Sequence, residues 1–233
     1  MTLRKWEDLP GFMRCPEVRK YYDILAGKKR ELILKRGFDA VTATVMLAVL
    51  AVPMLILAIL IKIDSPGPIF YRQERITSYG KKFRIHKFRT MVDNADKIGA
   101  SVTAGNDKRI TKIGYKIRRL RIDEIPQLID VMKGDMSFVG TRPEAEKYVK
   151  RYKPEYYATL LMPAGITSEA SVRYKDEEKL LSVADDIDRV YIEDILPEKM
   201  KWNLKSIEKI SFSGDLFTMF RTILAVLGKD YSK

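Results

Sequence analysis

The longest stretch of this chain without a charged residue extends over residues 40–61, and Asp39 and Lys62 close it at its two ends. At the rise of an α-helix, a stretch of this length covers about 33 Å, which is enough to cross the hydrocarbon core of a bilayer. Pro53 lies inside it, where a proline removes a backbone hydrogen bond and bends a helix. The pattern therefore predicts a membrane helix over residues 35–63 that is kinked at Pro53.

This helix has two possible topologies. Lys35 and Arg36 precede the apolar stretch and Lys62 follows it, so the positive-inside rule gives no orientation. A single span would place the two ends on opposite sides of the bilayer. A re-entrant hairpin bent at Pro53 would instead keep both basic ends among the headgroups of one face. The residues alone leave both topologies open.

The segments on either side of this helix are amphipathic. Residues 1–34 are basic, and they form either a lead-in that rests on a membrane surface or a plain soluble helix. Residues 64–195 are expected to form the core, and residues 196–233 to form C-terminal amphipathic helices. Among these, residues 212–227 either dock on the core or lie in the membrane interface, because they are apolar but too short and too charged for a span. At 233 residues we expect one compact domain.

The start of the core predicts a short antiparallel hairpin. Asp64-Ser65-Pro66-Gly67-Pro68 is a rigid turn. Residues 69–75 and 82–91 follow it, and the apolar positions of the second segment alternate with basic ones. The cationic face of this hairpin either binds phosphate or is an ordinary solvated surface. His86 within it is expected to be packed or hydrogen-bonded rather than catalytic.

Two later patterns give simpler predictions. Pro163-Ala164-Gly165-Ile166-Thr167 is expected to be a turn, because proline and glycine interrupt regular structure. A series of tyrosines at a spacing close to four residues predicts helix packing, and its members are Tyr148, Tyr152, Tyr156 and Tyr157.

The charge of the chain narrows the class of partner. The formal net charge of +12 indicates an anionic partner of one of three classes: phospholipid headgroups, a phosphorylated substrate or nucleic acid. Cys15 is the single cysteine and His86 the single histidine, so an internal disulfide and a Cys/His zinc site are excluded. A bound metal would therefore have oxygen ligands, which favours Mg²⁺ or Mn²⁺.

Residues 118–144 combine the groups that chemistry on an anionic substrate needs. Asp123 and Glu124 follow three arginines, of which Arg118 is the first, and precede Arg142 and Pro143. A carboxylate beside fixed cations stays ionised and can act as a nucleophile or a metal ligand, and spare guanidinium groups can grip phosphate. The alternative is an ordinary helix start, because acidic residues favour the first turn of a helix.

Five motifs occur in order along residues 35–225: Asp64-Ser65-Pro66-Gly67-Pro68 with Gln73 and Arg75, Lys87-Phe88-Arg89-Thr90-Met91, Asp123-Glu124-Ile125-Pro126-Gln127-Leu128, Gly134-Asp135-Met136-Ser137-Phe138-Val139-Gly140-Thr141-Arg142-Pro143, and Gly165-Ile166-Thr167. Together they resemble the motif series of bacterial sugar transferases, the monotopic phosphoglycosyl transferases. Any one of these motifs alone would be weak, but five in order are specific.

The resemblance implies a fold and an activity. The expected fold is a compact, α-rich α/β domain with a re-entrant membrane helix hairpin and interfacial amphipathic helices, on the cytoplasmic face of the bacterial inner membrane. The expected reaction moves a sugar-1-phosphate from a UDP-sugar to polyprenol (undecaprenyl) phosphate and releases UMP, through an aspartyl-phosphosugar intermediate and with Mg²⁺. The resemblance also favours the re-entrant topology. No nucleic acid partner is expected, and an oligomer is possible.

The resemblance also implies residue roles. Asp123 matches the nucleophile, and Glu124 is its neighbour in metal binding and catalysis, so both are candidate metal ligands. Lys87, Arg89 and the Arg142-Pro143 pair lie in motifs linked to the phosphates and uridine of the nucleotide sugar. Arg118, one of the three arginines before the dyad, joins them as a candidate phosphate ligand.

The chain departs from the family pattern at Thr141, where a proline is usual, and at Ala164, which separates Pro163 from the glycine that follows. The segment Ser168-Glu169-Ala170-Ser171-Val172-Arg173-Tyr174 replaces a commoner glycine-rich continuation. None of these changes touches Asp123 and Glu124, the carboxylate dyad, so we expect them to affect substrate specificity. We also expect the minimal form of the family, without several additional transmembrane helices.

Two other functions compete with the transferase. A non-catalytic, membrane-anchored basic module that binds anionic lipid or nucleic acid would agree with the charge, but acidic residues beside its arginines would weaken that binding. A nucleotide-sugar hydrolase would use the same first step, but a soluble substrate and water do not require a membrane helix.

Overall fold

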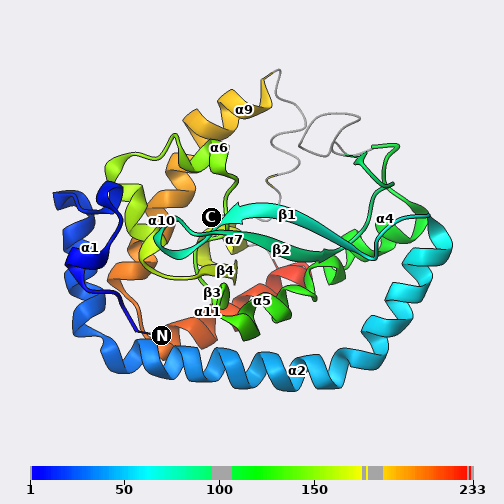
Figure 1. Cartoon of the computed structure of the whole chain (residues 1–233), viewed down its shortest axis with the longest axis horizontal. Helices are drawn as coiled ribbons and strands as arrows, with labels where there is room; N and C mark the ends of the chain where they lie inside the picture. Colours follow the sequence, from blue (N-terminus) through cyan, green and yellow to red (C-terminus); the bar gives the residue numbers. More distant parts are fainter. Residues whose placement is uncertain (1, 96–106, 175–176, 178–185, 230, 232–233) are drawn as a thin grey trace.

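A computed structural model describes residues 2–95, 107–174, 177, 186–229 and 231 of the chain (Figure 1). The described part is a helix-rich α/β structure. Its helices are α1 (Pro16–Gly27), α2 (Lys29–Asp64), α4 (Lys112–Arg119), α5 (Gln127–Lys133), α6 (Glu146–Val149), α7 (Glu169–Arg173), α9 (Ile187–Val190), α10 (Leu196–Glu208) and α11 (Phe212–Val226). Its strands are β1 (Phe70–Ile76), β2 (Lys82–Phe88), β3 (Met136–Val139) and β4 (Ala164–Thr167), and they form two separate two-stranded sheets.

The predicted membrane helix is α2, and it begins at Lys29, before the expected start of residues 35–63. Pro53 lies inside it without interrupting it. The two separate arms of the expected hairpin are therefore not seen. Figure 1 shows one continuous helix along the lower edge of the molecule that turns toward α4 in its second half. A proline removes a single intrahelical hydrogen bond, so an apolar helix can bend there and continue.

One face of α2 is covered by protein and the other is bare. Lys35, Asp39, Ala43 and Ile61 on the inner face are buried. Only 6% of the most apolar stretch of the helix is buried, and within the described residues α2 is the one helix long and apolar enough to cross a membrane. A bare apolar surface of this length is unfavourable in water and favourable in lipid. Its exposed side chains include Val41, Val45, Val49, Val52, Ile56, Ile59 and Ile63.

The N-terminal half of α2 is bonded to the core through buried charges. Lys35 Nζ donates to the carbonyl oxygen of Val139 at 2.7 Å and forms an ion pair with Asp215 Oδ2 at 2.6 Å. Asp39 Oδ2 accepts a hydrogen bond from Ser137 Oγ at 2.7 Å. These contacts join α2 to β3 and to α11, so α11 docks on the core while an apolar face of it stays exposed.

The apolar residues of the N-terminal segment face protein. Met13, Val18 and Leu25 are fully buried in the largest core cluster, which also contains Tyr152 and residues of α10 such as Met200. Tyr148 and Tyr156 belong to the same cluster, so the predicted packing role of the tyrosines is confirmed for these buried members. They lie on α6 and on a 3-10 helix, Pro154–Leu161, rather than on one long helix.

The predicted hairpin is confirmed. β1 and β2 pair antiparallel, with Phe70 opposite Phe88 and Ile76 opposite Lys82. His86 is buried in β2, as expected: its backbone N–H donates to Asp130 Oδ2 at 2.9 Å, and its Nδ1 lies 2.6 Å from Asp130 Oδ1. This pair fastens the hairpin to α5.

The predicted turn over residues 163–167 is wrong, because residues 164–167 are the buried strand β4, parallel to β3. Gly165, which suggested a turn, instead allows its backbone to approach that of Gly140 closely. A Cβ at Gly165 would lie 2.2 Å from the backbone N of Gly140. The two chains are held there by hydrogen bonds from Gly140 N to Thr167 O and from Gly165 N to Thr141 O, each 2.9 Å. Strand pairing across more than twenty-five residues leaves no local sequence signal.

Gly165→Ala is expected to lower the free energy of unfolding by about 1–3 kcal/mol or more, because its methyl group would overlap backbone atoms that have no space to move. Denaturation followed by circular dichroism in detergent measures this change. Gly27→Ala is the matched control, since a Cβ there meets nothing within 4 Å. A Gly165→Ala protein as stable as this control would contradict the close approach.

Candidate active site

The dyad lies on a short turn between two helices. Thr111 caps the N-terminus of α4, where its side chain accepts a hydrogen bond from Gly114 N, and the basic C-terminal residues of α4 suit the negative end of the helix dipole. Arg121 then takes a left-handed conformation, with φ of 56°, which reverses the chain. One turn of 3-10 helix, Ile122–Glu124, presents both carboxylates immediately before α5. The alternative prediction, that Asp123 and Glu124 mark the start of a helix, therefore describes the backbone correctly. It does not decide the chemical role of the two carboxyl groups.

Glu124 lies between two cations that come from distant parts of the chain. Its Oε1 accepts from Lys87 Nζ at 2.7 Å and from Arg142 Nη2 at 2.5 Å. Lys87 lies on β2, and Arg142 follows β3 directly. The β3–β4 pair fixes the backbone at Arg142, and the β1–β2 hairpin fixes Lys87. The three charges meet only because these elements pack together.

The two carboxyl groups of the dyad have opposite electrostatic environments. Burial acts to raise the pKa of Glu124, but the charges of Arg142 and Lys87 outweigh it and hold that pKa well below its ordinary range. Burial raises the pKa of Asp123, and the neighbouring Glu124 adds to this, while Lys87 and Arg118 act against it. Carboxyl groups whose pKa values are pushed apart in one site are typical of groups with different chemical roles.

The cations respond to the same charges. The charge of Glu124 raises the pKa of Arg142, although burial opposes this, so its guanidinium stays charged. Burial lowers the pKa of Lys87, and the nearby Glu124 partly offsets that effect. The site therefore holds a firmly ionised Glu124 and a permanently charged Arg142 beside a more basic Asp123.

Most of the predicted site residues come together, and one does not. Lys87, Asp123, Glu124 and Arg142 form one cluster, with Arg118 close enough to affect Asp123 and with Pro143 buried directly after Arg142. Arg89, directly after β2, lies apart from this cluster and contacts the C-terminal end of α2. Its Nη2 donates to the carbonyl oxygen of Ser65 at 2.6 Å and to Ser65 Oγ at 3.0 Å.

Sequence reasoning missed a second buried network behind Arg142. Tyr191 donates from its hydroxyl to Glu144 Oε1 at 2.5 Å, and Lys199 Nζ donates to the hydroxyl oxygen of Tyr191 at 3.1 Å and to Glu177 Oε2 at 2.9 Å. The charges of Glu144 and Glu177 also act to raise the pKa of Arg142. The position of Glu144 directly after the Arg142-Pro143 motif could have indicated that this residue belongs to the site. Tyr191 and Lys199 gave none, since they are distant in sequence.

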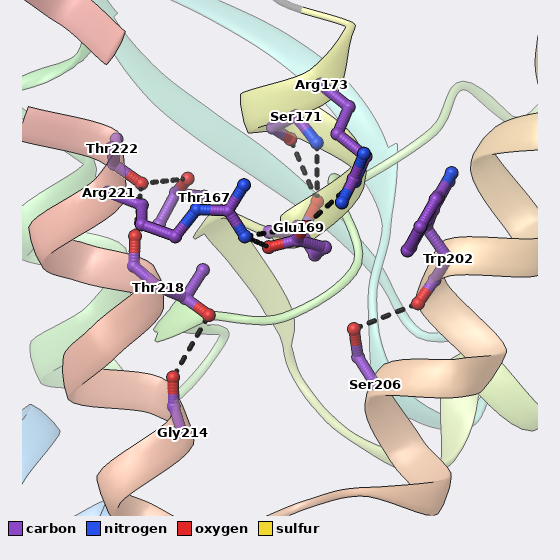
Figure 2. Close-up of polar contacts among 11 residues, drawn as sticks. Thr167, Glu169, Ser171, Arg173, Trp202, Ser206, Gly214, Thr218, Arg221 and Thr222 are labelled. Carbon is purple, nitrogen blue, oxygen red and sulfur yellow. Dashed lines mark hydrogen bonds and ion pairs between the residues drawn. The ribbon is translucent and has the colours of Figure 1, made fainter. Parts of the chain in front are cut away.

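The segment that departs from the family pattern is also held firmly (Figure 2). Glu169 lies between two arginines: it accepts from Arg221 Nη1 of α11 at 2.7 Å and from Arg173 Nε of α7 at 2.9 Å. The guanidinium of Arg173 in turn lies 3.8 Å from the centre of the Trp202 ring on α10. Both C-terminal helices therefore fix the segment that follows β4.

The dyad suits Mg²⁺ better than a softer metal. Within the described residues, no group of three or more His, Cys, Asp or Glu side chains is arranged to hold a metal ion. Asp123 and Glu124 nevertheless offer adjacent, hard carboxylate oxygens. Mg²⁺ is commonly held by one or two carboxylates together with the phosphates of a substrate and water, so this donor set fits it.

Comparison with known proteins identifies the family. The model of the bacterial sugar transferase family matches residues 30–229 of the chain, which include all of α2 except Lys29, the dyad and α11. The chain belongs to this family. Membership follows from a match over most of the chain, and the charged cluster around Glu124 falls inside it.

Several relatives in this family have reactions in their names. The chain is 35% identical over 197 residues to the UDP-N-acetylgalactosamine-undecaprenyl-phosphate N-acetylgalactosaminephosphotransferase of Aeromonas hydrophila, which is 83% of this chain and 44% of that protein. It is 30% identical over 218 residues to the undecaprenyl-phosphate galactose phosphotransferase of Salmonella typhimurium, 87% of this chain and 42% of that protein.

A third relative, the UDP-glucose:undecaprenyl-phosphate glucose-1-phosphate transferase of Escherichia coli, is 38% identical over 161 residues, 67% of this chain and 34% of that protein. The chain therefore spans less than half the length of each of these three transferases. Their names differ in the sugar and agree in the carrier.

The electrostatics of the dyad predict which carboxyl group titrates. In the folded protein, Asp123 should take up a proton at a pH above its ordinary 3.8, while Glu124 stays ionised through the same range. Carboxyl ¹³C NMR with labelled Asp and Glu measures both. Asp107 serves as the internal reference, because its hydrogen bonds from Arg109 lower its pKa to about 2. Titration of Glu124 at a higher pH than Asp123 would contradict the assignment.

Proposed function

We propose that this protein transfers a sugar-1-phosphate from a UDP-sugar to polyprenol phosphate, releases UMP, and so begins the assembly of a bacterial glycan on its lipid carrier. The observation that carries the proposal is the cluster in which Lys87 and Arg142 hold Glu124 beside Asp123. The names of the three transferases above support the same donor and acceptor. They differ in the sugar, so the sugar carried by this chain stays open.

In the first step, a carboxylate oxygen of Asp123 attacks the phosphorus that carries the sugar. A new bond forms between that oxygen and phosphorus, and the bond from phosphorus to the bridging oxygen of the diphosphate breaks. UMP leaves with the electron pair of that bond. The raised pKa of Asp123 supports this role, because a more basic carboxylate is the stronger nucleophile once it is ionised.

In the second step, a phosphate oxygen of the polyprenol phosphate attacks the same phosphorus, and the bond to Asp123 breaks. The product is a polyprenol diphosphate sugar, and the Asp123 carboxylate is restored. Arg142, Lys87 and Arg118 supply fixed positive charge near the phosphates in both steps, which stabilises charge that moves between oxygens. Glu124 keeps Lys87 and Arg142 in place through its two short contacts.

We propose that Asp123 and Glu124 hold Mg²⁺, which when bound would neutralise part of the charge of the diphosphate. The fit of two adjacent carboxylates supports this, with the remaining ligands supplied by substrate phosphates and water. Full UMP release in excess chelator would contradict a required metal.

We propose that α2 enters and leaves the membrane on its cytoplasmic face, so that the protein is monotopic in the bacterial inner membrane. Both ends of the helix are bonded to the same core: Lys35 to Val139 and Asp215 near the start, and Ser65 to Arg89 at the end. A core on one side of a bilayer cannot hold both ends of a spanning helix. The bend in α2 and its bare outer face support the same placement.

The non-catalytic basic module explains the dyad less well. A site that only binds an anion gains nothing from Asp123 and Glu124, because their negative charges weaken the attraction of Lys87 and Arg142 for that anion, whereas a transferase uses Asp123 as its nucleophile. The hydrolase would leave the apolar face of α2 without a purpose, since neither of its substrates lies in lipid.

Asp123→Asn should remove UMP release and the covalent phosphosugar adduct, because an amide cannot act as the nucleophile. Intact-mass analysis after mixing with a UDP-sugar, in the absence of carrier, detects the adduct on the wild type. Asp188→Asn is the matched control, an aspartate on α9 whose partners are Lys147 and Tyr148 outside the dyad. Adduct formation by the Asp123→Asn protein would sink the nucleophile assignment.

Cysteines placed at Lys29 and Lys62, in a Cys15→Ser background, should react with a membrane-impermeant maleimide from the same side of a sealed vesicle. Both positions lie on α2, on either side of its apolar stretch. Labelling from opposite sides would establish a spanning helix and contradict the re-entrant placement.

A further inference from the structure

We infer that Arg89 is a positioning residue: it locks the end of the membrane helix α2 to the strand that carries Lys87, and so sets the alignment of the site. This inference rests on the proposed function for its kinetic test. Arg89 is only 4% exposed. Its Nη2 donates to Ser65 O at 2.6 Å and Ser65 Oγ at 3.0 Å, and it lies 3.4 Å from Ile61 O.

The acceptors of Arg89 explain why a cation lies here. The last carbonyl groups of a helix have no partner within it and carry a partial negative charge. Arg89 supplies a buried positive charge and a donor at that point, while its backbone N–H donates to Ile69 O at 2.9 Å. The guanidinium is less strongly hydrated than an ammonium group and always charged, so it is the better suited of the two to a buried position at a helix end.

Gly67, in the turn after α2, is part of the same contact between Arg89 and the end of the helix. Gly67 has φ of 121°, a conformation that side chains rarely adopt. A Cβ at Gly67 would lie 2.2 Å from Arg89 Nη1 and 3.1 Å from Asp93 Cβ. The backbone therefore folds directly over the guanidinium. Two motifs that are far apart in sequence, the turn after α2 and the segment around Arg89, thus form one contact.

A second tie joins the end of α2 to the helix that leads to the dyad. Asp64, the last residue of α2, accepts from Ile113 N in the first turn of α4 at 2.9 Å. Thr111 N donates to Thr90 O at 3.1 Å, directly after Arg89. A Cβ at Gly114 would lie 2.0 Å from Thr90 O, so α4 packs on this segment with no free space.

The junction also has an apolar core. Ile61 of α2, Phe88 of β2 and Ile117 of α4 are buried together. The end of the membrane helix, the strand that carries Lys87 and the helix that leads to Asp123 therefore meet at one close-packed point. Only Phe88 separates Arg89 from Lys87 in the sequence, so a displacement at the junction moves Lys87 relative to Glu124. The rate of the chemical step depends on that alignment, whereas the affinity for the nucleotide sugar does not depend on Arg89 itself.

The kinetic test uses Arg89→Ala and Arg89→Lys in nanodiscs with undecaprenyl phosphate, and follows UMP release. We expect kcat to fall by at least about tenfold in Arg89→Ala and by less in Arg89→Lys. The KM for the UDP-sugar should stay unchanged, because misalignment slows the chemical step without removing a contact to the UDP-sugar. Arg84→Ala is the matched control, an exposed arginine on the same strand, and should keep the wild-type kcat. A raised KM with unchanged kcat would place Arg89 at the donor phosphates and overturn the inference, as would a wild-type kcat in Arg89→Ala.

Gly67→Ala provides a test that leaves every charge in place. Its methyl group should displace Arg89 and lower kcat as Arg89→Ala does, with the fold checked by circular dichroism. It also carries the test if Arg89→Ala does not fold. A Gly67→Ala protein with wild-type kcat would overturn the inference.

A distance measurement separates this inference from the proposed function. Spin labels at Lys62 and Arg84, in a Cys15→Ser background, report the separation between the end of α2 and β2 whether or not the protein is active. We expect a narrow distance distribution that broadens in Arg89→Lys and Gly67→Ala. An unchanged distribution would overturn the junction, whereas a wild type that releases no UMP while the distribution broadens would overturn only the proposed reaction.

Discussion

The ionised carboxylate of Glu124 is the constraint on which this structure depends. A partly buried charge is costly unless opposite charges compensate it, and here Lys87 and Arg142 do so at 2.7 and 2.5 Å. Lys87 lies in one two-stranded sheet and Arg142 follows a strand of the other, so the compensation requires the two sheets to pack around the dyad. The same three charges leave Asp123 in a different environment, where burial makes its carboxyl group more basic.

The membrane helix serves this cluster as a frame. Lys35 and Asp39 bond the N-terminal half of α2 to β3, and Arg89 bonds its end to the segment that follows β2. The helix thus runs beneath both sheets with its outer face bare. In the proposed reaction the acceptor phosphate lies at the level of the headgroups, and a site that rests on such a helix would lie at the same level. The bare apolar face of α2, the buried charges that bond α2 to the core and the dyad are therefore linked through this one helix.

Local sequence patterns predicted the elements with strong local signals. The apolar stretch, the β1–β2 hairpin and the cation–carboxylate motif were readable because their signals lie within short segments. The strand β4 was mistaken for a turn, because Gly165 is needed for an approach to Gly140 that only the folded chain shows. Arg89 was assigned to phosphate from its motif, whereas its contacts in the described structure are to the end of α2. Tyr191 and Lys199 left no pattern, since burial behind Arg142 depends on tertiary packing.

The most direct test of this account is UMP release by the purified protein in nanodiscs, from a panel of UDP-sugars, with and without undecaprenyl phosphate and Mg²⁺. The account predicts sustained release that requires the carrier and the metal and that is fastest with one sugar. Release of equal extent without the carrier would indicate transfer to water and contradict the transferase. Failure of every UDP-sugar in the panel, together with no adduct on Asp123, would contradict catalysis at this dyad.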